Sequence, residues 1–339
     1  MRIKDIAREA GVSTATVSHV INNSKYVSDA TRIKVELAIK KFDYHPNAHA
    51  QSLALGRSKI IGLLVSDISN PFFPEIIKGV QAAVEAMGYN LFLLNTNYDT
   101  NHTIEYVNRL IQMKVAGIIL MVAEFDEALN EVAKKKKTSI VFHDLGIVGD
   151  RSSKVSLDYA VGIDEAVRHL ASLGHTRIAH IAGSHEIHSG AIRQQAFTDS
   201  MQRQFPNGVE PKIYEGDFRF EGGRAAASRI LNEKVLPTAV VVANDLMALG
   251  AMQEFKNAGL QVPEDISIVG FDDISFASLS EPALTTVCSP RVEIGRRAVE
   301  ALMLTVDGTQ KKGIEIQIPT YLITRNSTAP PRADGDPRR

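Results

Sequence analysis

The sequence predicts a small all-α helix-turn-helix head followed by an α/β body of two doubly wound parallel-sheet lobes. Two short helical patterns joined by a glycine turn stand near the N-terminus, and continuous apolar runs alternate with helical segments from Lys59 onward. The 339 residues exceed the roughly 100–200 residues of one domain. Hydrophobic residues make up 44% and charged residues 23%, which is typical of a folded globular protein and excludes a disordered or fibrous chain.

The first helix is predicted over residues 3–10, where apolar residues recur at helical spacing. Gly11 follows where a helix end favours a left-handed residue. Ser13 is a suitable N-cap for a second helix that runs to Ile21. Two short helices joined by a tight turn that contains glycine have helix-turn-helix spacing.

A third helix is predicted from Asp29 to Phe42, with Ser28 as its cap. We expect Ile33, Leu37 and Phe42 to complete the small core of the head.

The second helix is expected to bury Val17, Val20 and Ile21 and to leave a small polar face outside. The outer residues are Thr14, Ala15, Ser18 and His19. Hydroxyls, an imidazole and methyl groups on such a face suit base edges in a DNA major groove. The alternative is a three-helix module that binds protein or has no ligand.

The charge distribution favours the nucleic-acid interpretation. Up to Ser58 there are nine Lys and Arg against five Asp and Glu, a net charge of +4, whereas the whole chain has −1. A basic head on an acidic body is typical of a chain that binds a polyanion through one end.

These residues resemble the head of the lactose/galactose-repressor (LacI/GalR) family of bacterial transcription regulators. The resemblance rests on Ile3–Ala7 and Gly11–Asn22, and it continues through Tyr44–Asn47 and Gln51–Ala54. It implies contacts with operator DNA from the recognition helix and from the segment that follows the head. The implied DNA-binding residues are Thr14, Ala15, Thr16, Ser18, His19, Asn47, His49, Ala50 and Leu53.

Residues 48–55 form a helix-prone segment of only about two turns, which is marginal in water without other support. A plain interdomain linker is the alternative. The resemblance implies a hinge helix that pairs with its dimer mate and inserts Leu53 into the minor groove.

The body is predicted to hold buried parallel strands, because its apolar runs are continuous and separated by helices. The runs are 60–65, 91–94, 117–121, 140–142, 178–181, 239–242 and 266–269. No nucleotide-binding or catalytic signature accompanies them, so we expect no enzyme and no cofactor. The spacing of His185, Glu186 and His188 is not that of a metal-ligand pair, and no metal is expected.

Polar and aromatic residues follow several of these strands, at the edge where open α/β sheets bind ligands. They are residues 66–73, Asp144, Asn244–Asp245 and Asp272–Asp273. Each Asp or Asn taken singly is also a candidate helix cap. Jointly they predict one crevice.

The body also resembles the effector domain of the same family, which has the fold of periplasmic sugar-binding proteins. Asn70–Phe73, Ala243–Asp245 and Gly270–Asp273 are among the motifs that carry the resemblance. It implies three crossings between the lobes, near 159–161, 288–291 and 318–322. It also implies ligand contacts from Asn70, Phe72, Phe73, Met121, Asp144, Arg193, Phe218, Asn244 and Asp272.

The resemblance favours a neutral monosaccharide over a purine as ligand. Purine-binding relatives carry a further arginine six positions before Arg193, and this chain has Ile187 there. Arg193 and Asp272 together suit neighbouring hydroxyls, because a guanidinium donates and a carboxylate accepts.

The sequence therefore predicts a DNA-binding transcription repressor whose operator affinity is controlled by a small molecule bound between the lobes. The expected domains are a head at 1–45, a hinge and linker at 46–58, an effector-binding and dimerisation domain at 59–328 and a disordered tail at 329–339. We expect a homodimer on palindromic operator DNA.

One cysteine and no apolar run of about 18 residues predict a cytoplasmic protein without membrane contact. One alternative is a sugar-binding or sugar-processing protein with an incidental head. The other is a DNA-binding regulator gated by a protein partner or a purine.

Overall fold

The computed structural model describes residues 2–22, 25–44, 58–123, 129, 131, 138–184, 187–206, 208 and 210–332. The expected hinge helix, with Asn47, His49, Ala50 and Leu53, lies outside the described residues, as do His185 and Glu186. The chain divides into two compact units: Met1–Lys59 with Gln112–Ala116, and Ile60–Ile111 with Gly117–Arg339. No described helix is long and apolar enough to cross a membrane.

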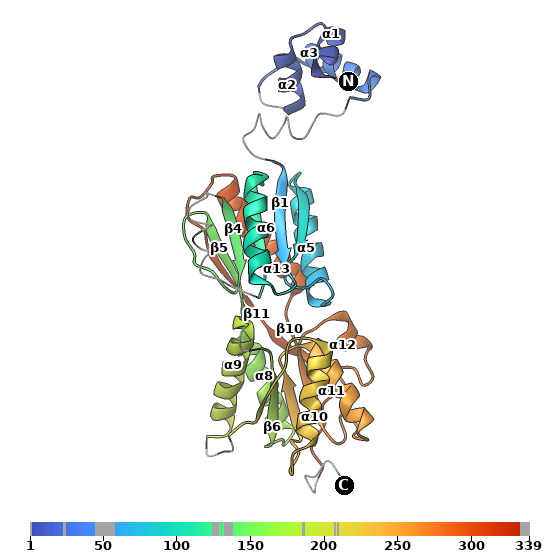
Figure 1. The fold of residues 1–339 in the computed structure, drawn as a ribbon, viewed down its shortest axis with the longest axis vertical. Helices are drawn as coiled ribbons and strands as arrows, with labels where there is room; N and C mark the ends of the chain where they lie inside the picture. The colour runs from blue at the N-terminus through green and yellow to red at the C-terminus, as the bar shows by residue number, and fades with distance from the viewer. Residues whose placement is uncertain are drawn as a thin grey trace. The chain divides into compact units, whose positions relative to one another are not determined.

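The head contains three helices, as predicted: α1 (Ile3–Ala10), α2 (Thr14–Asn22) and α3 (Asp29–Lys41) (Figure 1). The carboxylate of Asp5 accepts from the backbone N–H of Arg2 and so closes the first turn of α1. Gly11 has a left-handed backbone (φ 64°), and Ser13 Oγ accepts from the N–H of Thr16 at 3.0 Å. The turn between α1 and α2 is therefore fixed by a glycine C-cap and a serine N-cap.

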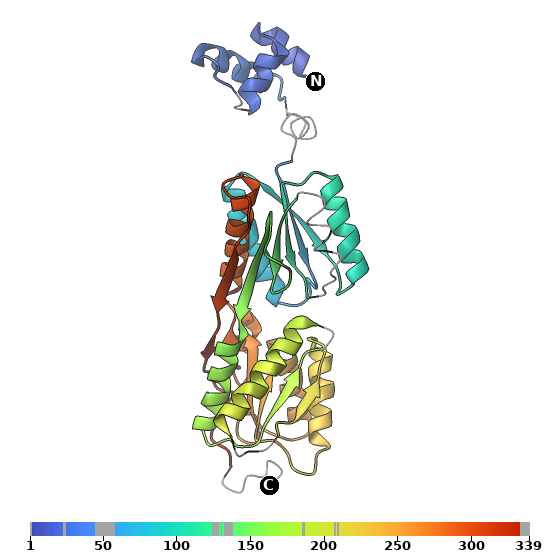
Figure 2. The same cartoon turned by 90° about the vertical axis from the view of Figure 1, so that its left-hand side faces the viewer.

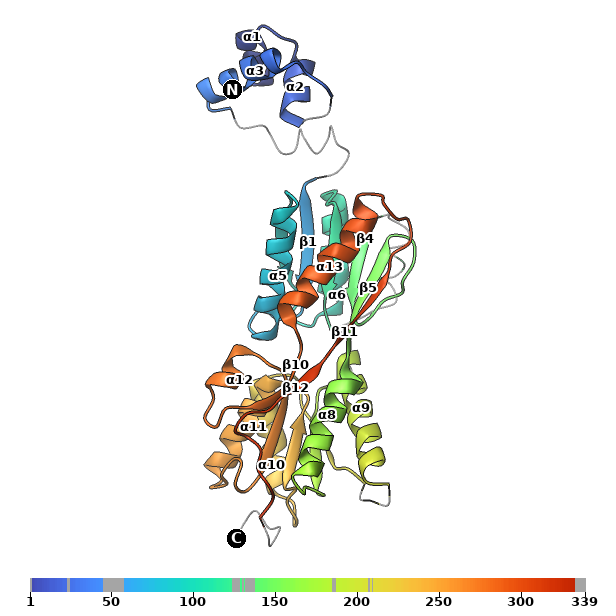
Figure 3. The same cartoon turned by 180° about the vertical axis from the view of Figure 1, so that it is seen from behind.

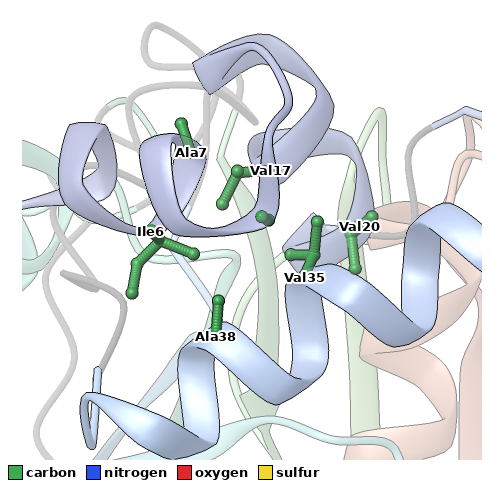
Figure 4. Close-up of a cluster of buried hydrophobic side chains, with 7 residues drawn as sticks. Ile6, Ala7, Val17, Val20, Val35 and Ala38 are labelled. Atoms are coloured by element: carbon green, nitrogen blue, oxygen red, sulfur yellow. The ribbon is translucent and has the colours of Figure 1, made fainter.

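The core of the head differs from the prediction on α3. Figure 4 shows the buried cluster, which consists of Ile6, Ala7, Ala10, Val17, Val20, Val35 and Ala38. The expectation for Ile33 and Leu37 was wrong, because their exposed fractions are 55% and 63%. The inward stripe of α3 instead runs through Val35, Ala38, Ile39 and Phe42, at i, i+3, i+4 and i+7.

The first lobe of the body, called the N-lobe, is built on a parallel sheet with strand order β11-β5-β4-β3-β1-β2. Figure 2 shows this sheet with α6 on one face and α5 and α13 on the other. The strands are β1 (Ile60–Val65), β2 (Asn90–Asn95), β3 (Gly117–Met121), β4 (Ser139–His143), β5 (Ser152–Asp158) and β11 (Glu315–Pro319). The helices are α5 (Phe72–Ala86), α6 (Thr100–Gln112) and α13 (Arg291–Val306).

The second lobe, called the C-lobe, has strand order β12-β10-β9-β8-β6-β7, and β12 pairs antiparallel with β10. The sheet is therefore not wholly parallel. The strands are β6 (Ile178–Ala182), β7 (Ile213–Glu215), β8 (Ala239–Val242), β9 (Ser267–Asp272), β10 (Thr285–Cys288) and β12 (Tyr321–Ile323). The helices are α8 (Tyr159–Ser172), α9 (His188–Gln204), α10 (Phe220–Leu231), α11 (Asp245–Asn257) and α12 (Ser275–Leu279).

The chain passes between the lobes from β5 to α8, from β10 to α13 and from β11 to β12 (Figure 3). These crossovers lie at 158–159, 288–291 and 319–321, close to the three ranges that the resemblance implies. The carboxyl ends of β1, β3 and β4 in one lobe and of β8 and β9 in the other are thereby directed to the space between the lobes.

The start of the predicted disordered tail is packed on the C-lobe. The carbonyl oxygen of Ala329 accepts from Ser267 Oγ at 3.1 Å and lies 2.8 Å from His175 Nε2. Arg332 forms an ion pair with Asp265. Residues 329–332 are therefore ordered, and 333–339 lie outside the described residues.

Candidate functional site

Helix α2 presents the predicted recognition residues on one side. Thr14 and Ala15 are exposed, and Thr16, Ser18 and His19 are half-buried. Val17 and Val20 are turned into the core, so packing fixes which face of α2 remains available. The exposed face carries short polar and methyl-bearing side chains, which allow close approach to a groove.

A cavity between the two lobes collects all nine residues that the sequence analysis assigned to a ligand. It includes about 580 Å³ of space, counted together with the solvent in its open mouth. The predicted residues in its wall are Asn70, Phe72, Phe73, Met121, Asp144, Arg193, Phe218, Asn244 and Asp272. The wall also holds Tyr98, Val122, Ala123, His143, Leu145, Tyr159 and Ser189, which the sequence analysis missed.

Arg193, on α9, is the buried cation of this cavity. Its guanidinium donates to the carbonyl oxygen of Ala243 and lies 3.5 Å from the carboxylate of Asp272. It stacks over the rings of Phe271 at 4.2 Å and Tyr159 at 4.9 Å. Its Nε is buried, and no hydrogen-bond partner for it is found among the described residues.

Asp272 ends β9 and turns into the cavity with a backbone φ of 113°. Burial raises the pKa of its carboxyl from 3.8 to about 6, because the charges of Arg193 and Arg291 only partly offset the loss of solvation. Asp272 therefore changes its charge just below neutral pH.

This pKa predicts a pH-dependent affinity for any ligand that donates a hydrogen bond to Asp272. A hydroxyl donates best to the ionised carboxylate, so binding should strengthen as pH rises through about 6. From pH 5 to pH 7 the ionised fraction rises about tenfold, and affinity should follow it.

Isothermal titration calorimetry at several pH values measures this change. In an Asp272→Asn variant the residual binding should lose this pH dependence. A parent affinity that stays constant from pH 5 to pH 7 would contradict the role of Asp272. His143 also lines the cavity, and a His143→Gln variant measures how much of the change in affinity with pH depends on His143.

Asp144 is the acidic residue on the N-lobe side of the cavity. Its carboxylate accepts from the hydroxyl of Tyr159 and from the N–H of Leu157 at 3.1 Å. His143 Nε2 lies 3.4 Å from the same carboxylate. Burial and the charge of Asp144 raise the pKa of Tyr159 well above its ordinary value, so Tyr159 remains a hydrogen-bond donor.

Asn244 is the N-cap of α11, Asn70 lies two residues before Phe72, the first residue of α5, and both asparagines line the cavity. Asn70 Oδ1 accepts from the N–H of Phe72, and Asn244 Oδ1 accepts from the N–H of Met247. Asn244 also donates to the carbonyl oxygen of Phe218 at 2.9 Å. Both amides thus hold the aromatic walls in place.

Asp245 and Asp273, also predicted to follow strands into the crevice, do not line the cavity. Asp245 is fully buried and accepts from Thr286 Oγ1 and from the N–H of Ile274. Burial and the charge of Asp272 raise its pKa well above the ordinary value. Asp273 forms an ion pair with Arg325. These two carboxyls order the loop behind the site.

Four cavity residues have positive φ angles: Tyr98 at 61°, Asp144 at 57°, Phe218 at 65° and Asp272 at 113°. Such conformations are uncommon for residues other than glycine and concentrate at functional sites. Asp144 and Asp272 stand at strand ends, whereas Tyr98 and Phe218 lie in the loops that follow β2 and β7.

Two comparisons of the sequence with known proteins match this architecture. A model of bacterial regulatory proteins of the lacI family matches residues 2–47, and a periplasmic binding protein-like domain matches residues 167–328. The chain is 36% identical over 329 residues to the ribose operon repressor of Escherichia coli (strain K12), covering 96% of this chain and 99% of that protein. It is also 36% identical to the HTH-type transcriptional repressor PurR of Pectobacterium carotovorum subsp. carotovorum (strain PC1), covering 96% of each.

Solved structures give the same result. The lac repressor dimer bound to operator and the anti-inducer ONPF has a TM-score of 0.87 at 30% identity, covering 97% of this chain and 99% of that chain. A LacI family regulator from Enterococcus faecium with bound ribose has a TM-score of 0.71 at 27% identity, covering 80% and 100%.

Proposed function

Because the chain belongs to the lacI family of bacterial regulatory proteins and is a DNA-binding repressor, we propose that a neutral monosaccharide of the pentose type controls its operator affinity. The sugar binds in the cavity between the lobes. The observation that carries the proposal is the juxtaposition of Arg193 and Asp272 from the C-lobe with Asp144 from the N-lobe around one space.

The charges in the cavity support a neutral ligand. Arg193 is the only lysine or arginine among the described residues of its wall, and Asp272 and Ala243 already hold it. An anionic ligand would meet the carboxylates of Asp144 and Asp272 with no free cation to offset them. A sugar hydroxyl can both donate to a carboxylate and accept from the Arg193 guanidinium.

The aromatic wall supports a ligand with an apolar face. Phe72 and Phe73 pack edge to face, with ring centroids 5.3 Å apart, and Phe218 lies on the opposite lobe. A pentose presents C–H groups to such rings and hydroxyls to the polar residues. The cavity offers aromatic rings for the C–H groups and polar side chains for the hydroxyls.

Isothermal titration calorimetry with the full chain tests the ligand class. The panel contains D-ribose, other aldopentoses, aldohexoses, ribose 5-phosphate and the bases adenine, guanine and hypoxanthine. We expect a neutral pentose to bind and its phosphate ester to bind far more weakly. Tight binding of a purine base without sugar binding would replace the proposal by a purine-controlled repressor.

We further propose that the protein acts in the cytoplasm as a homodimer, with two heads reading the half-sites of a near-palindromic operator. Two-fold symmetry in the protein then matches two-fold symmetry in the DNA. Sedimentation velocity, with and without operator, should give the mass of two chains. A monomer on a single half-site would contradict this arrangement.

A further inference from the structure

Two of the three crossovers are followed by a helix whose first residue reaches back to a cavity aspartate. Tyr159 is the first residue of α8 in the C-lobe, and it donates to Asp144 of the N-lobe. Arg291 is the first residue of α13 in the N-lobe, and it donates to the backbone carbonyl of Asp272 in the C-lobe. Each residue therefore binds the lobe that the chain has just left.

The bond from Tyr159 is closely linked to the cavity. Tyr159 is buried, and its ring lies 4.9 Å from the Arg193 guanidinium and 5.6 Å from the Phe271 ring, both in the C-lobe. Its hydroxyl alone reaches across to the carboxylate of Asp144. The ring thus packs against the C-lobe, and the hydroxyl binds the N-lobe.

The bond from Arg291 links the cavity to α5. Arg291 is buried, and its Nε and second terminal nitrogen lie 3.0 Å from the carboxylate of Glu75 in the first turn of α5. Its remaining terminal nitrogen donates to Asp272 O and lies 3.4 Å from Ser289 O. Helix α5 begins with Phe72 and Phe73, so Arg291 joins both sides of the cavity.

Helix stability does not explain a cation at this position. The N-terminus of a helix carries a partial positive charge, so an arginine in the first turn is unfavourable for α13 itself. Asp272 meanwhile has a φ of 113°, a conformation that persists only when surrounding contacts hold it. The fork of Arg291 supplies such a contact, because a planar guanidinium can serve several acceptors at once.

We propose that Tyr159 and Arg291 are positioning residues that couple occupancy of Asp144 and Asp272 to the relative orientation of the two lobes. This inference rests on the proposed function, since it supposes a ligand in the cavity. A carboxylate has several acceptor positions, so a ligand hydroxyl can share Asp144 with Tyr159 and draw the two lobes together. A rotation of the lobes breaks both bonds, and their loss therefore favours the alternative arrangement.

The test uses the full chain, with the variants Tyr159→Phe and Arg291→Lys. Phenylalanine keeps the ring and loses the hydroxyl, and lysine keeps the charge and loses the fork. Tyr214→Phe is the matched control for the first, because its hydroxyl binds Glu233 at 3.0 Å within the C-lobe. Arg224→Lys is the control for the second, because its fork binds Glu254 at 3.1 Å and 3.2 Å within the same lobe.

Hydrogen exchange measured by mass spectrometry without any sugar is the first readout. We expect amides of 153–158, 285–291 and 315–322 to exchange about tenfold to a hundredfold faster in both variants, because the lost bonds hold the crossovers closed. The controls should leave these segments unchanged. Exchange equal to the parent in both variants, at unchanged circular dichroism, would overturn the proposal.

Titration with D-ribose is the second readout. If D-ribose binds the parent, Tyr159→Phe should change the affinity for D-ribose by a smaller factor than it changes the affinity for operator DNA. If no sugar of the panel binds but hydrogen exchange without sugar is still faster in both variants, the proposed effector is wrong. The proposed role of Tyr159 and Arg291 is then still supported. Should Tyr159→Phe not fold, Asp144→Ala removes the acceptor of the same bond and should raise the sugar-free exchange of 153–158 in the same way. Exchange equal to the parent's in that variant would overturn the proposal.

Discussion

Arg193→Ala is expected to abolish effector binding while leaving operator binding in the absence of ligand intact. The guanidinium lies 3.5 Å from the Asp272 carboxylate and is the proposed donor to the ligand. Loss of one charge-assisted hydrogen bond, at roughly 1.5–3 kcal/mol, corresponds to roughly one to two orders of magnitude in affinity, and the loss of the contact that orients Asp272 adds to it. Titration calorimetry and an operator gel shift measure the two properties separately.

Arg203→Ala is the matched control for this substitution. Arg203 lies on the same helix, α9, and pairs with Asp164 at 2.8 Å outside the cavity. It should leave effector binding unchanged. An Arg193→Ala protein that binds the sugar as tightly as the parent would remove Arg193 from the site.

Replacing Ala15 or His19 is expected to change the operator sequence that the protein prefers. Both lie on the face of α2 opposite the buried Val17 and Val20, and a good contact with a base edge discriminates by about 1–3 kcal/mol. Selection from an operator library with randomised half-sites, for Ala15→Val and His19→Ala beside the parent, measures the change.

Arg8→Ala provides the contrasting control. Arg8 is an exposed cation on α1, so its loss should weaken all sequences alike and reduce the salt dependence of binding. If the Ala15 and His19 variants select the parent's operator, α2 is not the helix that reads bases.

Strands were predictable from the sequence where their residues are continuously apolar, and much less so elsewhere. β1, β3 and β8 match the predicted runs at both ends. β5 was missed because it begins Ser152-Ser153-Lys154, and the hydroxyls of its buried serines are satisfied by carbonyl oxygens of Ile147 and Ala301. Polar residues can occupy a buried strand when tertiary partners exist, and a single sequence does not reveal those partners.

The site was predictable to the extent that it follows strand ends. His143 and Tyr98 stand at or just after the ends of β4 and β2, so the same rule extends to them. Tyr159 follows β5 and was missed together with that strand. Asp245 was placed in the crevice because nothing in the sequence distinguishes a carboxyl that binds a ligand from one that Thr286 holds.

The error on α3 has a different cause. Ile33 and Leu37 were chosen as apolar residues one turn apart, yet the inward stripe runs through Val35 and Ala38. Apolar character alone does not fix the phase of a short helix when both of its sides carry apolar residues.

Binding of a neutral sugar in the cavity and binding of operator DNA by the head are expected to change each other's affinity. Fluorescence anisotropy of labelled operator, with and without saturating D-ribose or whichever pentose binds, measures this coupling. Operator affinity should change by roughly fivefold or more, and the affinity for the sugar should change by the same factor when operator is bound. Equal sugar affinity for free and operator-bound protein would contradict the account.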